Sequence, residues 1–233
     1  METFPTHWQL RSPVSFRLPY ERVKLVLDIL LASLTLIVLL PLCLLVALAI
    51  RLDSRGSILY AQERVGLDRR RRPGPSSYGS DRRKQRGFGR PFMIYKFRSI
   101  RSDAEKGTGP VWAAKEDPRA TRVGAFLRRS HLDELPQLIN VLRGEMSMVG
   151  PRPERPQLFG SLVAEIPEYA LRCRALPGIT GIAQIKNGYD LSLQTAARKV
   201  QYDLYYIRHG GVLFDVKIMA ATALVLVNGK EGD

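Results

Sequence analysis

Cysteine is scarce in this sequence, which holds only Cys43 and Cys173 in 233 residues. Two cysteines cannot build a disulfide framework or a cysteine-rich metal cluster, which suits a reducing compartment. Internal repeats, zinc-ligand spacing and phosphate-binding signatures of the GxxxxGK[ST] and GxGxxG types are also absent. The sequence therefore argues against a disulfide-stapled domain, a zinc domain and the common nucleotide-binding loops.

Acidic residues are in the minority, since 22 aspartates and glutamates face 36 lysines and arginines, a formal net charge of +14. This excess points to anionic partners: nucleic acid, an anionic membrane surface or phosphorylated substrates. The length suffices for one domain with a core, or for one domain with an appendage.

One long apolar run, residues 29–50, contains 22 residues without a charge. At about 1.5 Å per residue it would form a helix of roughly 33 Å, close to the ~30 Å thickness of the hydrocarbon core of a bilayer. The run is longer than the ~7–15-residue core of a signal peptide and lacks a clear cleavage site. It is also apolar all round, unlike an amphipathic core helix. We therefore predict membrane association.

The apolar run contains Pro41, which removes a backbone hydrogen bond and clashes with the carbonyl of Ile37 in a straight helix. A kink there leaves halves too short to cross a bilayer alone. Both flanks of the run are basic, so the positive-inside rule places both ends on the cytoplasmic side. A re-entrant helix that breaks at Pro41 and returns satisfies both observations, and a kinked spanning helix is the alternative.

Two segments, residues 57–65 and 92–100, are rich in β-branched and aromatic residues and predict the strands of a short hairpin. Residues 66–91 between them hold nine basic and two acidic residues among glycine, proline and serine, which is typical of a mobile loop. The loop is either a solvated charged segment or an anchor on anionic lipid headgroups. RNA binding is disfavoured, because no aromatic stacking platform alternates with the charges.

Further along the chain, residues 119–131 predict a basic helix, and residues 135–142 predict a second helix that ends before Gly144. Residues 177–181 predict a turn. Residues 212–227 are largely apolar but contain two charges, so they predict an interfacial or core helix rather than a spanning one.

The strongest candidate for chemistry is the adjacent pair Asp133 and Glu134, at a predicted helix start. The helix dipole and nearby guanidinium groups would keep such a carboxylate ionised, so it could attack phosphorus or bind a divalent cation. An ordinary helix N-terminus with acidic first-turn residues is the alternative. His131 is similarly expected to be an exposed polar residue.

An anionic diphosphate that approaches this pair would meet repulsion of roughly 4 kcal/mol for each like-charge pair at about 4 Å. Mg²⁺ and several cationic side chains would have to offset that repulsion. The available cations at element ends and in tight turns are Lys96, Arg98, Arg128, Arg129 and Arg152.

Four segments, taken in order, resemble one family. They are IYKFRSI at 94–100, RVGAFLRRSHLDELPQLINVLRGEMSMVGPRPE at 122–154, LPGITGIAQI at 176–185 and YDLYYI at 202–207. Together they resemble the bacterial sugar transferases, monotopic polyprenyl-phosphate phosphoglycosyl transferases that initiate capsule, exopolysaccharide and glycoprotein glycan assembly. The resemblance covers residues 21–227 and is to the small members that consist of the catalytic core.

The resemblance implies a role for each matching position. Asp133 would form a covalent phosphosugar intermediate and help to bind Mg²⁺, and Glu134 would be a second catalytic residue, acting in metal binding or as a base. Phosphates would be held by Lys96, Arg98, Arg128 and Arg152. The nucleotide-sugar would lie near Pro177, Gly178, Thr180, Gly181 and Gln184.

The resemblance also implies a mostly helical α+β fold: a membrane-embedded monotopic catalytic domain with a re-entrant helix broken at Pro41, a short β-hairpin and interfacial amphipathic helices. Residues 1–56 would form the N-terminal segment and membrane helix, and residues 57–233 the catalytic domain on the cytoplasmic face of a bacterial inner membrane. The expected substrates are a UDP-sugar and polyprenyl (undecaprenyl) phosphate. The lipid bilayer, a second copy in a homodimer and downstream glycosyltransferases are further expected partners, and nucleic acid is not.

The sequence departs from the family at Leu176, where relatives often carry a basic residue, and Arg174 offers a compensating charge. Two other functions compete with the transferase. One is a membrane-anchored protein that binds nucleic acid or anionic lipid through the basic loop. The other is an interaction subunit that recruits glycan machinery without catalysis, and the intact pair Asp133 and Glu134 weighs against it.

Overall fold

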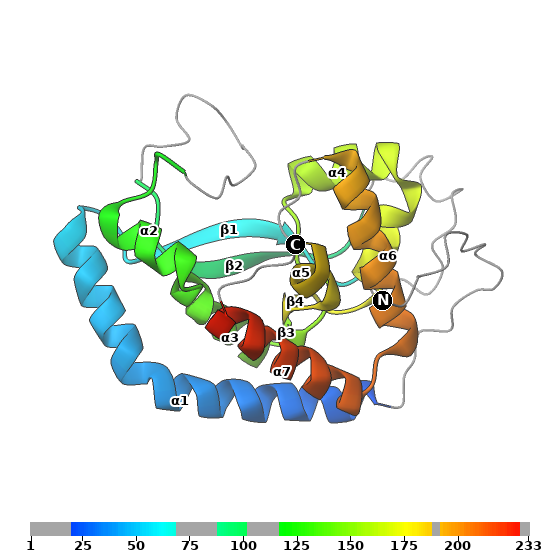
Figure 1. Cartoon of the computed structure of the whole chain (residues 1–233), viewed down its shortest axis with the longest axis horizontal. Coiled ribbons are helices and arrows are strands. Elements are labelled where there is room, and N and C mark those ends of the chain that lie inside the picture. The colour runs from blue at the N-terminus through cyan, green and yellow to red at the C-terminus, as the bar shows by residue number, and fades with distance from the viewer. Residues whose placement is uncertain (1–19, 69–87, 102–116, 188–191, 229–233) are drawn as a thin grey trace.

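The computed structural model describes residues 20–68, 88–101, 117–187 and 192–228. These residues form a mostly helical α+β fold with two separate two-stranded sheets, as predicted (Figure 1). The elements are α1 (Glu21–Asp53), β1 (Leu59–Val65), β2 (Pro91–Phe97), α2 (Arg122–Arg129), η3 (Leu132–Gln137), α3 (Leu138–Leu142), β3 (Ser147–Val149), α4 (Pro156–Glu165), η4 (Pro167–Arg174), β4 (Gly178–Thr180), α5 (Ile182–Asn187), α6 (Leu193–His209) and α7 (Val212–Asn228).

The N-terminal helix α1 contains the whole apolar run and continues through Pro41 without interruption. The predicted break in the helix is therefore wrong. Figure 1 shows instead a bent helix whose two halves run in different directions. A proline inside a helix removes one hydrogen bond and can bend the axis without ending the helix, so Pro41 accounts for the bend.

One side of α1 is apolar and exposed. Large aliphatic side chains such as Leu30, Ile37 and Leu44 are 62%, 71% and 63% exposed. Among the described residues α1 is the one helix long and apolar enough to cross a membrane, and 11% of its most apolar stretch is buried. Water disfavours an apolar surface of this length, so the surface supports membrane association.

The other side of α1 packs on the rest of the protein. Ala32 lies in a core cluster with Phe92 and Ile94 of β2, and Ile50 lies in another with Phe97 and Leu127. The membrane helix is thereby part of the hydrophobic core that supports β2.

The N-terminal half of α1 is also fastened to α7 by polar contacts. Lys24 Nζ and the Tyr20 hydroxyl donate to Asp215 Oδ2 at 2.6 Å and 3.1 Å, and the Tyr206 hydroxyl donates to Asp215 Oδ1 at 2.8 Å. The helix predicted at residues 212–227 is confirmed as α7. Its aspartate, which the sequence showed only as an interruption of the apolar pattern, joins the two helices.

Strands β1 and β2 form the predicted antiparallel hairpin, with Tyr60 opposite Lys96. Phe92 and Ile94 are buried, and Lys96 continues the same face of the strand, since side chains alternate with a period of two. Most of the basic segment predicted between the strands, residues 69–87, lies outside the described residues, so its role stays a prediction.

The basic helix predicted at residues 119–131 is confirmed as α2. The helix predicted at residues 135–142 begins earlier, as the 3₁₀ helix η3, and continues as α3. It ends before Gly144, as predicted, and that glycine has a left-handed φ of 67°.

The predicted turn at residues 177–181 is instead a strand, because β4 pairs in parallel with β3. Two glycines allow the chains to approach this closely: a Cβ on Gly178 would stand 2.0 Å from the backbone nitrogen of Gly150. Gly150 N donates to the carbonyl of Thr180 at 2.8 Å. The second sheet thus joins the segments on either side of η4, which the sequence presents as separate turns.

Candidate active site

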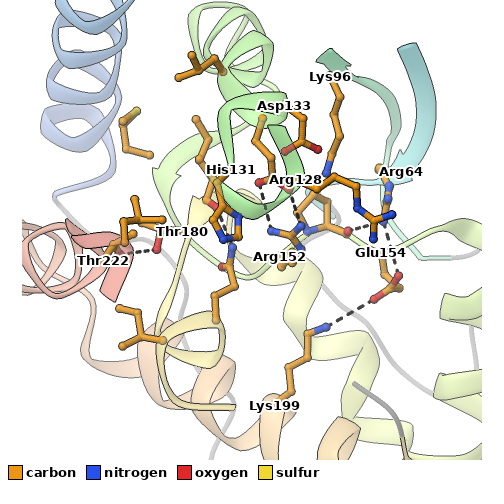
Figure 2. Close-up of a pocket in the computed structure, with 18 of the residues that line it drawn as sticks. Arg64, Lys96, Arg128, His131, Asp133, Arg152, Glu154, Thr180, Lys199 and Thr222 are labelled. Atoms are coloured by element: carbon orange, nitrogen blue, oxygen red, sulfur yellow. Dashed lines mark hydrogen bonds and ion pairs between the residues drawn. The ribbon is translucent and has the colours of Figure 1, made fainter. Parts of the chain in front are cut away.

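A cavity of about 480 Å³ contains the pair Asp133 and Glu134 (Figure 2). Seven of the predicted site residues line it: Lys96, Arg128, Asp133, Glu134, Arg152, Thr180 and Gln184. The other five, which do not line it, are Arg98, Arg129, Pro177, Gly178 and Gly181. The fold therefore gathers side chains from segments far apart in the sequence around the two carboxylates.

The local backbone separates the two carboxylates. His131 precedes η3 with a left-handed φ of 56°, which turns the chain sharply after α2. Successive side chains of a 3₁₀ helix point about 120° apart, so Asp133 and Glu134 face different surroundings. His131 is half-buried and lines the cavity, so the expectation of an exposed residue is wrong.

Glu134 is clamped between two cations. Lys96 Nζ donates to Glu134 Oε1 at 2.6 Å, and Arg152 donates to both carboxylate oxygens, at 2.6 Å and 3.3 Å. Although burial raises the pKa of Glu134, the charges of Arg152 and Lys96 outweigh burial and hold that pKa well below its usual range. Glu134 is therefore a permanent anion that fixes two cations.

Asp133 receives none of these bonds. It is buried, and burial raises the pKa of its carboxyl, with the charge of Glu134 acting in the same direction and that of Lys96 against it. A desolvated carboxylate that is not clamped is more reactive than a solvated or paired one. Asp133 is thus the carboxylate with the greater capacity for nucleophilic attack.

The chemistry of the pair fits Mg²⁺ bound together with a substrate. Among the described residues no three His, Cys, Asp or Glu side chains gather into a metal cluster. Mg²⁺ commonly binds through one or two carboxylates and the phosphates of a substrate, because it keeps much of its hydration shell. The Asp133 carboxylate, beside the fixed cations Lys96 and Arg152, suits such a shared ion.

Two of the predicted phosphate-binding arginines lie elsewhere. The Arg98 guanidinium donates to the carbonyls of Ile50, Ser54 and Arg55 at 3.3, 2.6 and 2.9 Å, so it closes the C-terminal end of α1. Arg129 is exposed on α2. Arg128 lies in the cavity wall, 3.3 Å from Asp117.

The segment at residues 177–181 contributes through its end. Thr180 lines the cavity, and its hydroxyl lies 2.6 Å from that of Thr222 on α7. Gln184 donates to the carbonyl of Ile179 at 2.7 Å and also lines the cavity. The glycines on either side shape the backbone that presents them.

Four charged residues of the cavity were missed as site residues: Arg64, Glu154, Arg155 and Lys199. The only sequence signal for Glu154 was its place at the end of the GPRPE segment. Lys199 belongs to no motif, so only the tertiary structure reveals it.

Comparison with known proteins identifies the family. The model of the bacterial sugar transferase family matches residues 19–229. An undecaprenyl-phosphate glucose phosphotransferase of Komagataeibacter xylinus is 42% identical over 204 residues, which are 85% of this chain and 35% of that protein. A UDP-glucose:undecaprenyl-phosphate glucose-1-phosphate transferase of Xanthomonas campestris pv. campestris is 39% identical over 209 residues, which are 89% of this chain and 39% of that protein.

A shorter relative aligns over nearly its whole length. The exopolysaccharide production protein PSS of Rhizobium leguminosarum bv. phaseoli is 37% identical over 214 residues, which are 89% of this chain and 97% of that protein. This chain thus spans little more than a third of the first two relatives and almost all of the third. The chain belongs to the bacterial sugar transferase family, as its sequence motifs predicted.

Proposed function

We propose that this protein is a phosphoglycosyl transferase that moves a sugar 1-phosphate from a UDP-sugar to undecaprenyl phosphate and releases UMP. The observation that carries the proposal is the buried Asp133 carboxylate beside a Glu134 that Lys96 and Arg152 hold at 2.6 Å. The names of relatives describe undecaprenyl-phosphate sugar phosphotransferases, which supports the same reaction.

In the first half-reaction, a carboxylate oxygen of Asp133 attacks the phosphorus that carries the sugar. The bond from this phosphorus to the bridging oxygen breaks, and UMP leaves with the electron pair. Lys96 and Arg152, which Glu134 fixes in place, offset the charge that develops on the phosphates. Mg²⁺ held by Asp133 and the diphosphate would supply further charge neutralisation.

In the second half-reaction, a phosphate oxygen of the acceptor attacks the same phosphorus. The bond to Asp133 breaks and the free carboxylate returns, so the product is polyprenyl-diphosphate-sugar. Glu134, as a permanent anion, keeps the cations in position through both halves. Direct attack of the acceptor on the nucleotide-sugar is the competing mechanism, with Asp133 as a metal ligand alone.

We place this reaction at the cytoplasmic face of a bacterial inner membrane, as the first membrane step of exopolysaccharide or glycoconjugate synthesis. The exposed apolar side of α1 and its bend support a re-entrant helix, since basic residues flank both of its ends. The exposed leucines of α7, such as Leu213 and Leu224, support an interfacial position for that helix.

The decisive experiment uses the enzyme with UDP-sugar and Mg²⁺ before any acceptor is added. UMP release and a sugar-phosphate mass on Asp133 are expected, and polyprenyl phosphate should then discharge the adduct. Asp133→Asn should form no adduct, because it lacks the anion. Strictly sequential kinetics without an adduct would rule out the covalent mechanism and leave the overall reaction standing.

A further inference from the structure

The cavity has a second cationic region. Arg64 on β1, Arg155 at the start of α4 and Lys199 on α6 line the same cavity as Asp133. Figure 2 shows Arg64 and Lys199 on the side of the cavity opposite Thr222 of α7. Three elements distant in sequence therefore bring three cations to one end of the cavity.

Glu154 lies between two of these cations without being clamped by them. Its Oε1 is 3.6 Å from an Arg64 terminal nitrogen, and its Oε2 is 3.6 Å from Lys199 Nζ. Both distances exceed that of a good charged hydrogen bond, which is about 2.7–2.9 Å, whereas the Lys96–Glu134 contact meets it at 2.6 Å. The cations at this end thus face one another around a loosely held carboxylate.

The Arg64 guanidinium is oriented and incompletely satisfied. Its terminal nitrogens donate to the carbonyl of Pro153 at 3.0 Å and to Gln62 Oε1 at 2.7 Å. Its Nε is buried and has no hydrogen-bond partner. A buried donor without a partner is unfavourable, so an acceptor oxygen of a ligand would relieve it.

The charges at this end do not balance. Arg172, which lies nearby, is neutralised by Asp203 at 2.6 Å, so it adds no free charge. Arg64, Arg155 and Lys199 then face Glu154, which leaves about two positive charges in excess. A phosphate group with up to two negative charges has the complementary charge and several acceptor oxygens.

We propose that Arg64, Arg155 and Lys199 form a second phosphate subsite in the cavity, distinct from the cations that Glu134 holds. The inference rests on the proposed function, which requires phosphates of two substrates. The phosphate of the nucleotide fits this subsite better than that of the lipid. The opposite end of the cavity is lined by Val225 and Leu226 of α7, which suit a polyprenyl chain.

The test compares Lys199→Gln and Arg64→Gln with Arg198→Gln, a matched control at an exposed neighbouring residue on α6. UMP binding to the full-length protein is measured by isothermal titration calorimetry. Loss of a charge-assisted contact should weaken UMP binding roughly ten- to a hundredfold in the first two variants and leave the control unchanged.

Two further variants guard against simple misfolding. Lys199→Arg keeps the charge and should restore most of the affinity. Arg155→Gln changes a half-buried residue and should weaken UMP binding in the same direction if either of the more buried variants fails to fold.

The apparent affinity for polyprenyl phosphate, measured on the same variants, assigns the source of the phosphate. If only acceptor affinity falls, the subsite stands but holds the lipid phosphate. If neither affinity changes in folded variants, the subsite is overturned. Failure of the proposed function itself is distinguishable, because the wild-type protein would then bind no UMP.

Discussion

Asp133 and Glu134 are consecutive residues in opposite electrostatic surroundings. Glu134 accepts hydrogen bonds of 2.6 Å from both Lys96 and Arg152, whereas neither cation bonds to Asp133. The pKa of Asp133 is raised, chiefly by burial, and the pKa of Glu134 is lowered despite burial, because the two cations outweigh it. The pair therefore combines a structural anion with a destabilised carboxylate that is available to react.

This contrast predicts stability changes of opposite sign. Asp133→Asn removes a charge that the fold disfavours, so it should raise the unfolding temperature, by about 1 kcal/mol or roughly 2–4 °C. Glu134→Gln removes the partner of two cations and should lower the free energy of unfolding by roughly 1.5–3 kcal/mol. Both variants should lose turnover. Thermal unfolding in one detergent provides the measurement, and shifts of the same sign in both variants would contradict the contrast.

The same groups predict a pH dependence. The lowered pKa of Glu134 means that its stabilising contribution is complete above its ordinary value of 4.5 and is lost as the pH falls toward the lower folded-state value. The raised pKa of Asp133 means that its unfavourable contribution, present at neutral pH, disappears on acidification. Glu134→Gln should therefore lose less stability than wild type below pH 4.5, and the advantage of Asp133→Asn should shrink, in unfolding measured across an acid titration.

Two glycines predict a matched pair of stability effects. A Cβ on Gly178 would stand 2.0 Å from Gly150 N, a contact between backbones that no side-chain movement relieves. Gly178→Ala should thus destabilise the protein by about 1–3 kcal/mol or more. Gly160 lies inside α4 with nothing within 4 Å of an added Cβ, so Gly160→Ala should stabilise by about 0.8–1 kcal/mol. Equal effects in the two variants would argue against the close β3–β4 approach.

Arg98 and Arg152 predict a separation of stability from activity. Arg98 donates to three backbone carbonyls at the end of α1, so Arg98→Ala should cost at least about 1.5–3 kcal/mol of stability and leave the turnover of folded molecules largely intact. Arg152 has a 40% exposed side chain in the cavity, so Arg152→Ala should chiefly reduce turnover. Activity per folded molecule is the measurement, and its collapse in Arg98→Ala would return that residue to the phosphate site.

The bend in α1 predicts the topology. Single cysteines at Glu21 and Ser57, in a Cys43-free background, should both be labelled from the cytoplasmic side alone. Pro41→Ala should straighten the helix and shift some molecules toward a spanning orientation. Labelling of the two positions from opposite sides would refute the re-entrant helix.

Local chemistry in the sequence determined much of this protein. The uncharged run at residues 29–50 specifies a long apolar helix, and the β-branched segments around residue 66 specify the hairpin, because each pattern acts over neighbouring residues. The family motifs named Asp133, Glu134, Lys96 and Arg152, which the fold does bring together.

Only the tertiary structure decided which charged side chain serves which purpose. Arg98 and Lys96 are two residues apart, yet one closes a helix end and the other holds Glu134. Lys199 and Arg64, outside every motif, meet across Glu154 because α6 and β1 pack on the same segment. A charge acts over several ångströms in space whatever the intervening chain length, so its role follows from packing, which no local pattern encodes.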